Sequence, residues 1–196
     1  GKDDRLTVPG LGGRFQSGHA DLVREGYDVL LVAMGGIAAE AVAAADLLAA
    51  DNVSAAVLVV ASVSPAPVED LAKALARFRL AFTVEAHSVA GGVGSLVAEV
   101  IAEQGIGCRL VRCGVRAAPD GLSGSAAYFH GVHGLSASAL AQAVRRALDP
   151  SVGGSDRRSP RHPPTVTGAG EGFSSSAPAK PALGPRSPRP KGIAGG

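Results

Sequence analysis

The chain of 196 residues carries a formal net charge of +2, with 46% hydrophobic residues, 4% aromatic residues and no tryptophan. Residues 1–150 hold 12 Lys and Arg against 15 Asp and Glu, a net charge of −3, which gives no case for specific nucleic-acid binding. No secretory signal is visible, and no apolar run approaches the ~20 residues that a membrane helix needs. We therefore expect a soluble, cytoplasmic protein. Because the chain begins with Gly rather than Met, we also expect residues upstream.

The first part of the chain predicts a linker, a strand and a helix. Residues 1–26 are rich in Gly and charge, and are expected to be an N-terminal linker segment with room for one short strand. Residues 27–34 (YDVLLVAM) form an apolar run after a polar lead, which is typical of a strand covered on both faces in a parallel sheet. Gly35 and Gly36 then turn the chain into an alanine-rich helix over residues 37–50.

Two further strand–helix units follow. Residues 55–61 (AAVLVVA) predict a second buried strand, and residues 64–67 (SPAP) open a helix, since Pro is tolerated in a first turn and Ser at a cap. Residues 80–85 predict a third buried strand, and a Gly-rich turn over residues 91–95 leads into a third helix. Its apolar residues have the period of one helix face: Val93, Leu96, Val97, Val100 and Ile101.

The last elements are a fourth strand, a loop and a final helix. Residues 108–115 (CRLVRCGV) predict the strand, and its two arginines indicate a sheet edge. Residues 116–135, rich in Gly and small residues, are expected to form a long loop. Ser136 or Ser138 caps the last helix.

The two cysteines, Cys108 and Cys113, lie on the same predicted strand. Five residues apart on an extended chain, they point to opposite faces, so no disulfide is expected between them. We interpret them as buried small hydrophobic residues in a reducing compartment.

The order of elements predicts an α/β fold over residues 27–149, a three-layer α/β/α sandwich with a mainly parallel sheet. The composition changes after this domain. Residues 151–196 contain 8 of the 13 prolines and 9 of the 27 glycines, with a net charge of +5. So little apolar content cannot offset the entropy of ordering the chain, and we expect a disordered tail over residues 150–196.

Two enzyme classes fit the sequence poorly. A Rossmann enzyme has a glycine turn after its first strand, but here the turn reads GGIAAE rather than G-x-G-x-x-G, and the second strand lacks an acidic residue at its end. A hydrolase or metal enzyme is not supported either, because there is no G-x-S-x-G and no Cys/His cluster with metal-ligand spacing. His130 and His133 are interpreted as surface or supporting histidines.

Glu85 and His87 end the third strand at the carboxyl edge, where α/β sheets place functional groups. Such a pair can do acid–base chemistry, hold a loop in shape or meet a partner chain. Because no nucleophile stands beside them in the sequence, we favour a role in the loop or at a partner.

Several consecutive phrases carry a resemblance to a known family: REGYDVLLVAMGGIAAEAVAAADLLA, VLVVASVSPAPVEDL, FTVEAHSVAGGVGSLVAEVIAE, VRCGVRAAPDGLSGS and HGLSASALAQAV. From about Phe15 to Leu148 the chain resembles the C-terminal domain of the transketolase family. Deoxyxylulose-phosphate synthase and the beta subunits of 2-oxoacid dehydrogenases share this fold. The SGS sequence at residues 123–125 and the Gly-Leu pair at 134–135 favour transketolase proper, whereas Ala86 replaces the family's second Glu before the His.

The resemblance implies a thiamine-diphosphate enzyme that transfers two-carbon ketol units between sugar phosphates. In the family a Gly-Asp-Gly…Asn motif holds the diphosphate through Mg²⁺, but this chain has no such motif, and its only Asn is Asn52. The family's pyrimidine-binding domain lies upstream. The resemblance therefore implies that the assembled enzyme binds thiamine diphosphate and Mg²⁺, and that this chain contains no catalytic residue.

The partners implied by the resemblance are other transketolase domains, or a subunit carrying the cofactor site, in a homo- or hetero-oligomer. The domain's own role is then structural, at domain and dimer interfaces. The expected interface residues, which also form a candidate anion site, are Glu85, His87, Gly91, Gly92, Gly94, Ser95, Ser123 and Gly124. The alternative is a stand-alone α/β module that binds a nucleotide or other anion at the helix N-terminus formed by Gly91–Ser95.

Overall fold

A computed structural model describes residues 7–116 and 124–149 of the chain. Its strands are β1 (Ala20–Arg24), β2 (Val29–Met34), β3 (Ala55–Val60), β4 (Leu80–Ser88) and β5 (Arg109–Val115). Its helices are α1 (Ala38–Ala49), α2 (Val68–Leu75), α3 (Val93–Glu103), α4 (Ala126–Val132) and α5 (Ala137–Leu148), with a short 3-10 helix η1 (Gly35–Ile37) before α1. The tail over residues 150–196 lies outside the described residues, and the expectation for it does too.

The five strands form one sheet in the order β1-β3-β2-β4-β5. The strands β2 to β5 run parallel, whereas β1 pairs with β3 in the antiparallel sense, with Ala20 opposite Val60. The predicted mainly parallel sheet is confirmed. The short strand expected within residues 1–26 is β1, and its hydrogen bonds make it an edge strand of the domain's own sheet.

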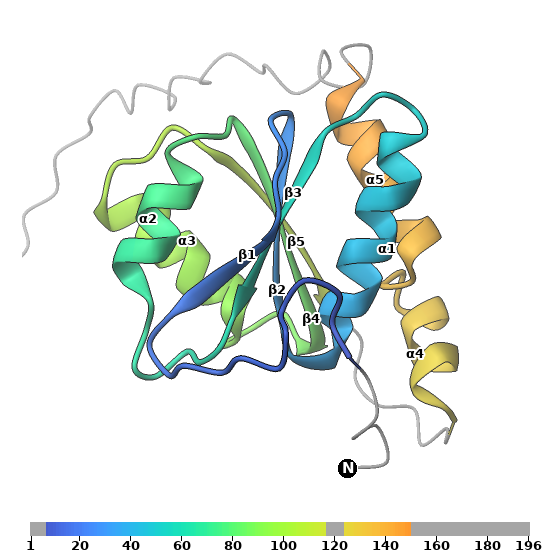
Figure 1. Cartoon of the computed structure of the whole chain (residues 1–196), viewed down its shortest axis with the longest axis horizontal. Coiled ribbons are helices and arrows are strands. Elements are labelled where there is room, and N and C mark those ends of the chain that lie inside the picture. The colour runs from blue at the N-terminus through green and yellow to red at the C-terminus, as the bar shows by residue number, and fades with distance from the viewer. Residues whose placement is uncertain (1–6, 117–123, 150–196) are drawn as a thin grey trace, which may run out of the picture. The chain divides into compact units, whose positions relative to one another are not determined.

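Helices cover both faces of the sheet, which confirms the predicted three-layer sandwich (Figure 1). The helices α1 and α5 pack on one face, and α2 and α3 on the other. The strands β2 and β3 are apolar along their whole length because successive side chains enter opposite cores. Leu31 of β2 lies in the core under α1 and α5, while its neighbour Leu30 lies in the core under α2 and α3.

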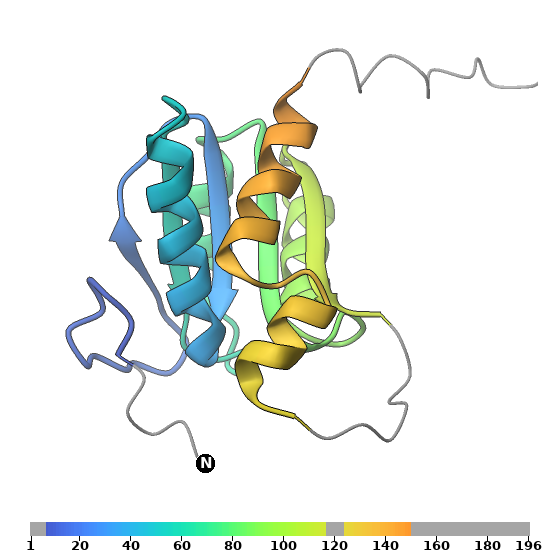
Figure 2. The same ribbon diagram turned by 90° about the vertical axis from the view of Figure 1, so that its right-hand side faces the viewer.

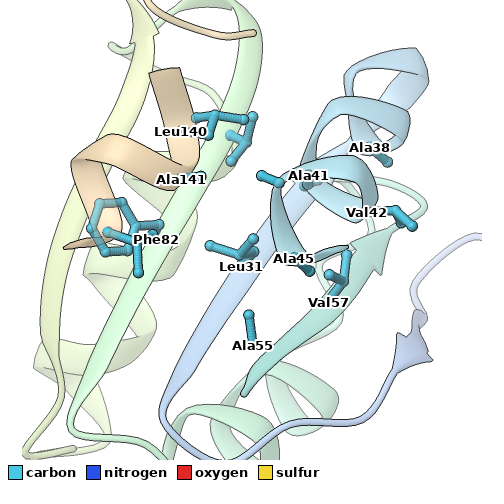
Figure 3. Packing of buried hydrophobic residues seen from close by; sticks show 14 of the residues in the cluster. Leu31, Ala38, Ala41, Val42, Ala45, Ala55, Val57, Phe82, Leu140 and Ala141 are labelled. Carbon is cyan, nitrogen blue, oxygen red and sulfur yellow. The ribbon is translucent and has the colours of Figure 1, made fainter. Parts of the chain in front are cut away.

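The core under α1 and α5 is built from small side chains. Figure 3 shows Ala41 of α1 facing the sheet near Leu31, and Phe82 of β4 beside Leu140 and Ala141 of α5. Alanine on a helix face allows a close approach to the sheet, so the one large aromatic ring, Phe82, fills the space under α5. The alanine-rich composition of α1 therefore serves packing as well as helix propensity.

Two predicted boundaries are wrong in an informative way. The expected loop over residues 116–135 contains α4, which has no buried residue and therefore shows no apolar period in the sequence. The strand β4 runs three residues past its predicted end at Glu85, and its pairing with β5 shifts register between Val84 and Ser88. The predicted cap of α5 is resolved, since Ser136 accepts a hydrogen bond from the Ala139 N–H.

The fourth predicted strand, β5, is an edge strand, as its arginines indicated. Both cysteines are free thiols, and they point to opposite faces as predicted. Cys108 lies in the core under α2 and α3, and Cys113 packs against the core under α1 and α5. Burial raises the pKa of both thiols, and that of Cys113 rises to about 11 although the nearby Arg116 guanidinium lowers it.

Truncating a core residue of α5 tests the packing under α1 and α5. Leu140 is 1% exposed, so Leu140→Ala should lower the free energy of unfolding by about 2–5 kcal/mol through lost burial and a residual cavity. Leu148→Ala in the same helix is the matched control, because Leu148 is 37% exposed and should cost less than about 1 kcal/mol. Urea unfolding of both variants measures the difference, and equal losses would contradict the described packing.

The raised pKa of Cys113 predicts an alkaline loss of stability. Between the ordinary thiol pKa of 9.0 and the folded value of about 11, the unfolded chain loses the Cys113 proton while the folded chain keeps it. The free energy of unfolding therefore falls as the pH rises through this window. In urea titrations from pH 8 to 11, Cys113→Ala should show a shallower decline than wild type. Parallel declines would contradict the burial of the thiol.

Candidate functional site

The predicted site lies at the point where the order of the strands in the sheet reverses. In the sheet, β3 lies on one side of β2 and β4 lies on the other side. After β3, the chain therefore crosses over β2 to form β4. The helices α1 and α2 that make these two connections lie on opposite faces, so the carboxyl ends of β2 and β4 form the switch point of the fold (Figure 1). The turn η1 contacts β4 here, and Glu85 and His87 lie at the end of β4.

Glu85 is a fully buried carboxylate at the N-terminus of α3. Its side chain is 0% exposed, and its Oε1 accepts a hydrogen bond of 3.3 Å from the Gly94 N–H in the first turn of α3. The positive end of the helix dipole also favours a negative group at this place. The Oε2 atom of Glu85 and the Oγ1 atom of Thr83 are buried and have no hydrogen-bond partner among the described residues.

The imidazole ring of His87 lies next to the Glu85 oxygen that has no hydrogen-bond partner among the described residues. Its Nδ1 lies 3.4 Å from Glu85 Oε2 and 3.2 Å from the carbonyl oxygen of Ser88. The His87 side chain is 55% exposed, so the ring joins a buried carboxylate to the surface. The predicted pair of Glu85 and His87 is therefore brought together by the fold.

Glycines make room for this pair. A Cβ on Gly92 would lie 1.9 Å from Glu85 Oε2 and 2.5 Å from His87 Cε1, closer than any side chain tolerates. A Cβ on Gly94 would lie 2.7 Å from Glu85 Oε1 and 2.9 Å from Thr83 Oγ1. Gly91 is required for a different reason, since its φ of +79° is in the left-handed region.

Ser95 closes the turn. Its Oγ accepts a hydrogen bond of 2.9 Å from the Gly91 N–H and donates to the Val89 carbonyl at 3.4 Å. The Arg112 guanidinium donates to the same carbonyl at 2.8 Å. The amides of Gly91 and Gly94 thus have partners within the chain, and the anion facing the N-terminus of α3 is Glu85 itself.

The remaining predicted site residues are Ser123 and Gly124. Ser123 lies outside the described residues. Gly124 precedes α4, where Ser125 caps the helix by accepting a hydrogen bond from the Tyr128 N–H. The Gly-Leu pair ends this region, because Gly134 has a φ of +69° and Leu135 is 1% exposed in the core.

Sequence reasoning missed a second carboxylate at this end. Glu40 in the first turn of α1 accepts a hydrogen bond of 2.7 Å from the Ala137 N–H at the start of α5, and lies 3.5 Å from His130 Nδ1. His130 of α4 is therefore an inward residue, with a side chain only 15% exposed. No motif connects Glu40 with His130, because they are distant in sequence and only the tertiary structure pairs them.

Exposed apolar residues also gather at the carboxyl edge. The helix α4 lies at this end, below α5 (Figure 2), and presents Tyr128 and Val132, of which Val132 is 59% exposed. The segment before β1 reaches the same edge, since its His19 carbonyl accepts a hydrogen bond from the Ala61 N–H just after β3. This segment carries Phe15, which is 73% exposed. Exposed aromatic and branched side chains at one edge are typical of a contact surface.

Neither of two grooves among the described residues lies at Glu85. Grooves of ≈ 260 and ≈ 250 Å³ lie beside β1 and α2, and none of the predicted site residues lines either of them. No group of three or more His, Cys, Asp or Glu among the described residues is placed to hold a metal ion. A buried Glu85 would also repel a diphosphate, so this edge does not fit thiamine diphosphate with Mg²⁺.

Comparison with known proteins identifies the family. The profile of the transketolase C-terminal domain matches residues 18–140, which covers more than half of the chain. The chain belongs to the transketolase C-terminal domain family. The resemblance of its sequence phrases and the predicted fold are thereby confirmed.

Relatives of this transketolase C-terminal domain include parts of larger proteins. It is 38% identical over 126 residues to a subunit of the apulose-4-phosphate transketolase of Actinobacillus succinogenes, covering 64% of this chain and 40% of that protein. It is 34% identical over 149 residues to the 1-deoxy-D-xylulose-5-phosphate synthase of Heliobacterium modesticaldum, covering 75% of this chain and 22% of that protein. The chain thus spans less than half the length of these relatives.

A solved structure shows the same fold. The split-gene transketolase solved as an inactive beta4 tetramer superposes with a TM-score of 0.64 at 34% identity, covering 72% of this chain and 46% of that chain. None of the helices among the described residues of this transketolase C-terminal domain is long and apolar enough to cross a membrane.

Substituting Gly92 tests whether the absence of a side chain at this position leaves the space that Glu85 and His87 occupy. Gly92→Ala places a methyl group on Glu85 Oε2, so it should lower the free energy of unfolding by about 1–3 kcal/mol through overpacking. Gly107→Ala is the matched control, because nothing lies within 4 Å of a Cβ at that position, and should change stability by less than about 0.5 kcal/mol. Urea unfolding compares the two variants. A neutral Gly92→Ala would show that the carboxylate is not held against this turn.

Proposed function

We propose that this chain is the C-terminal domain or small subunit of a transketolase-like enzyme that depends on thiamine diphosphate and Mg²⁺. The enzyme transfers two-carbon ketol units between sugar phosphates. The domain's own role is structural, at the interface with the domains or subunit that carry the cofactor, within a homo- or hetero-oligomer. Family membership supports this proposal, as does the short span of the chain relative to its relatives.

The carboxyl edge is the proposed contact surface. One observation carries this assignment: α4 has no buried residue, and it presents Tyr128 and Val132 at the end of the domain where the carboxyl edge lies. An apolar helix face of this kind is stabilised when a neighbouring domain covers it. His87 and Gly91 are exposed at the same edge and are the residues that we place against the same neighbour, with Glu85 buried beneath them. One relative is named as a transketolase subunit and another is solved as a beta4 tetramer, which supports association between transketolase subunits.

Association with cofactor-bearing domains tests the proposal. We would shorten the Heliobacterium modesticaldum synthase by the C-terminal section that matches this chain and co-express it, tagged, with the full 196-residue chain. We expect the two to purify together. Val132→Asp should weaken co-purification by about tenfold or more, because an unpaired charge is costly in an interface. Tyr27→Asp, at an exposed position before β2, is the matched control and should have no effect.

Ligand binding by the chain alone separates this proposal from a stand-alone module. Calorimetric titration with thiamine diphosphate plus Mg²⁺, NADH and ATP should show no binding. Micromolar affinity for thiamine diphosphate would overturn the structural role. A response to NADH or ATP would favour an anion-binding module, and failure of the wild-type chain to associate would count against the proposed interface.

A further inference from the structure

The atoms around the His87 ring indicate which of its two nitrogens carries the hydrogen. Two oxygens face Nδ1: the Oε2 of Glu85 at 3.4 Å and the carbonyl of Ser88 at 3.2 Å. A carbonyl oxygen only accepts hydrogen bonds, and so does an ionised carboxylate. A bare Nδ1 would face two lone-pair groups, so the hydrogen belongs on Nδ1.

The buried carboxylate strengthens this assignment. Water cannot reach Glu85, which is 0% exposed, and its other oxygen already accepts the Gly94 N–H. The nearby Arg112 guanidinium is directed to the Val89 carbonyl instead. Oε2 has no hydrogen-bond partner among the described residues, and an unsatisfied buried carboxylate is costly. The His87 Nδ1 lies 3.4 Å from it, so a hydrogen on Nδ1 is attracted to the carboxylate even without a hydrogen bond.

Packing fixes the ring as well as its hydrogen. The Cε1 of His87 lies over Gly92, where a Cβ would approach to 2.5 Å. With Nδ1 turned inward, no described residue hydrogen-bonds Nε2, although the side chain is 55% exposed. A neutral imidazole carries one hydrogen, so an Nδ1–H ring leaves the lone pair of Nε2 free.

We infer that Glu85 is a positioning residue that holds His87 as the Nδ1–H tautomer, and that the His87 Nε2 accepts a hydrogen bond from an N–H or O–H donor on the neighbouring transketolase domain. The inference rests on the proposed function for the identity of the neighbour. To the proposed function the inference adds the chemistry of one contact. A donor group on the partner forms a hydrogen bond to the His87 Nε2, whose orientation is fixed on this chain. A partner carboxylate, which would require a doubly protonated ring, is an outcome that the test distinguishes.

The tautomer is measured on the full chain without any partner. Long-range ¹H–¹⁵N NMR at pH 7.5 should show His87 with a protonated Nδ1 and a bare Nε2, in a ratio of about tenfold or more, because Nδ1 faces the Ser88 carbonyl and the Glu85 carboxylate, and both attract a hydrogen. Glu85→Gln should bring this ratio close to one or reverse it, since the new amide N–H₂ can donate to Nδ1. His133, which has no carboxylate partner among the described residues, is the internal reference. An Nε2–H or doubly protonated ring in wild type would overturn the inference.

The contact itself is tested by replacing His87 in the co-purification assay. His87→Asn keeps an amide N–H near the place of Nδ1 but has no Nε2, so it should lower association about tenfold at unchanged folding stability. His87→Gln extends an amide oxygen towards the place of Nε2, and should recover part of the association. Association of His87→Asn equal to wild type would overturn this inference and leave the proposed function standing. No association by wild type would overturn the proposed interface, whereas the NMR result would still decide the tautomer.

Discussion

The site depends on one buried charge, the carboxylate of Glu85. Removing a carboxylate from water costs several kcal/mol unless hydrogen bonds and opposite charge compensate it. Here the compensation comes from the Gly94 N–H and from the N-terminal end of the α3 dipole, while the His87 Nδ1 lies 3.4 Å from the Oε2 atom that makes no hydrogen bond among the described residues. Each requires the chain to approach closely, which explains why Gly92 and Gly94 lack a side chain. The Glu, the His and the glycines of this stretch are therefore one physical unit rather than separate motifs.

A second carboxylate, that of Glu40, also accepts a hydrogen bond from a backbone N–H at the start of a helix. Glu40 at the start of α1 accepts the Ala137 N–H at the start of α5, and it also lies beside His130 of α4. In both places an acidic residue from one element satisfies the first turn of a helix that follows elsewhere in the chain. At this edge Tyr128 and Val132 are exposed, while Glu85 Oε2 and Thr83 Oγ1 are buried without a hydrogen-bond partner among the described residues.

The predictions that succeeded depend on local patterns. The apolar runs predicted β2, β3 and β4 to within a few residues, because a strand covered on both faces must be apolar throughout. The missed element, α4, has no buried face, so its sequence lacks the period on which helix prediction relies. The anion site expected at the Gly91–Ser95 turn stays a prediction, and the structure adds that the Glu85 carboxylate lies at the same helix end.

The sequence by itself determined the order of strands and helices, the fold class and the family resemblance, because these follow from periodicity and motifs read within short windows. It also brought Glu85, His87 and the glycine turn to notice as one stretch. Only the tertiary structure decided that Gly94 donates to Glu85, that Nδ1 of His87 faces inward, and that His130 meets Glu40. These are pairings between side chains and backbone groups whose directions are set by packing across elements, and no local pattern records which partner the fold will bring within reach.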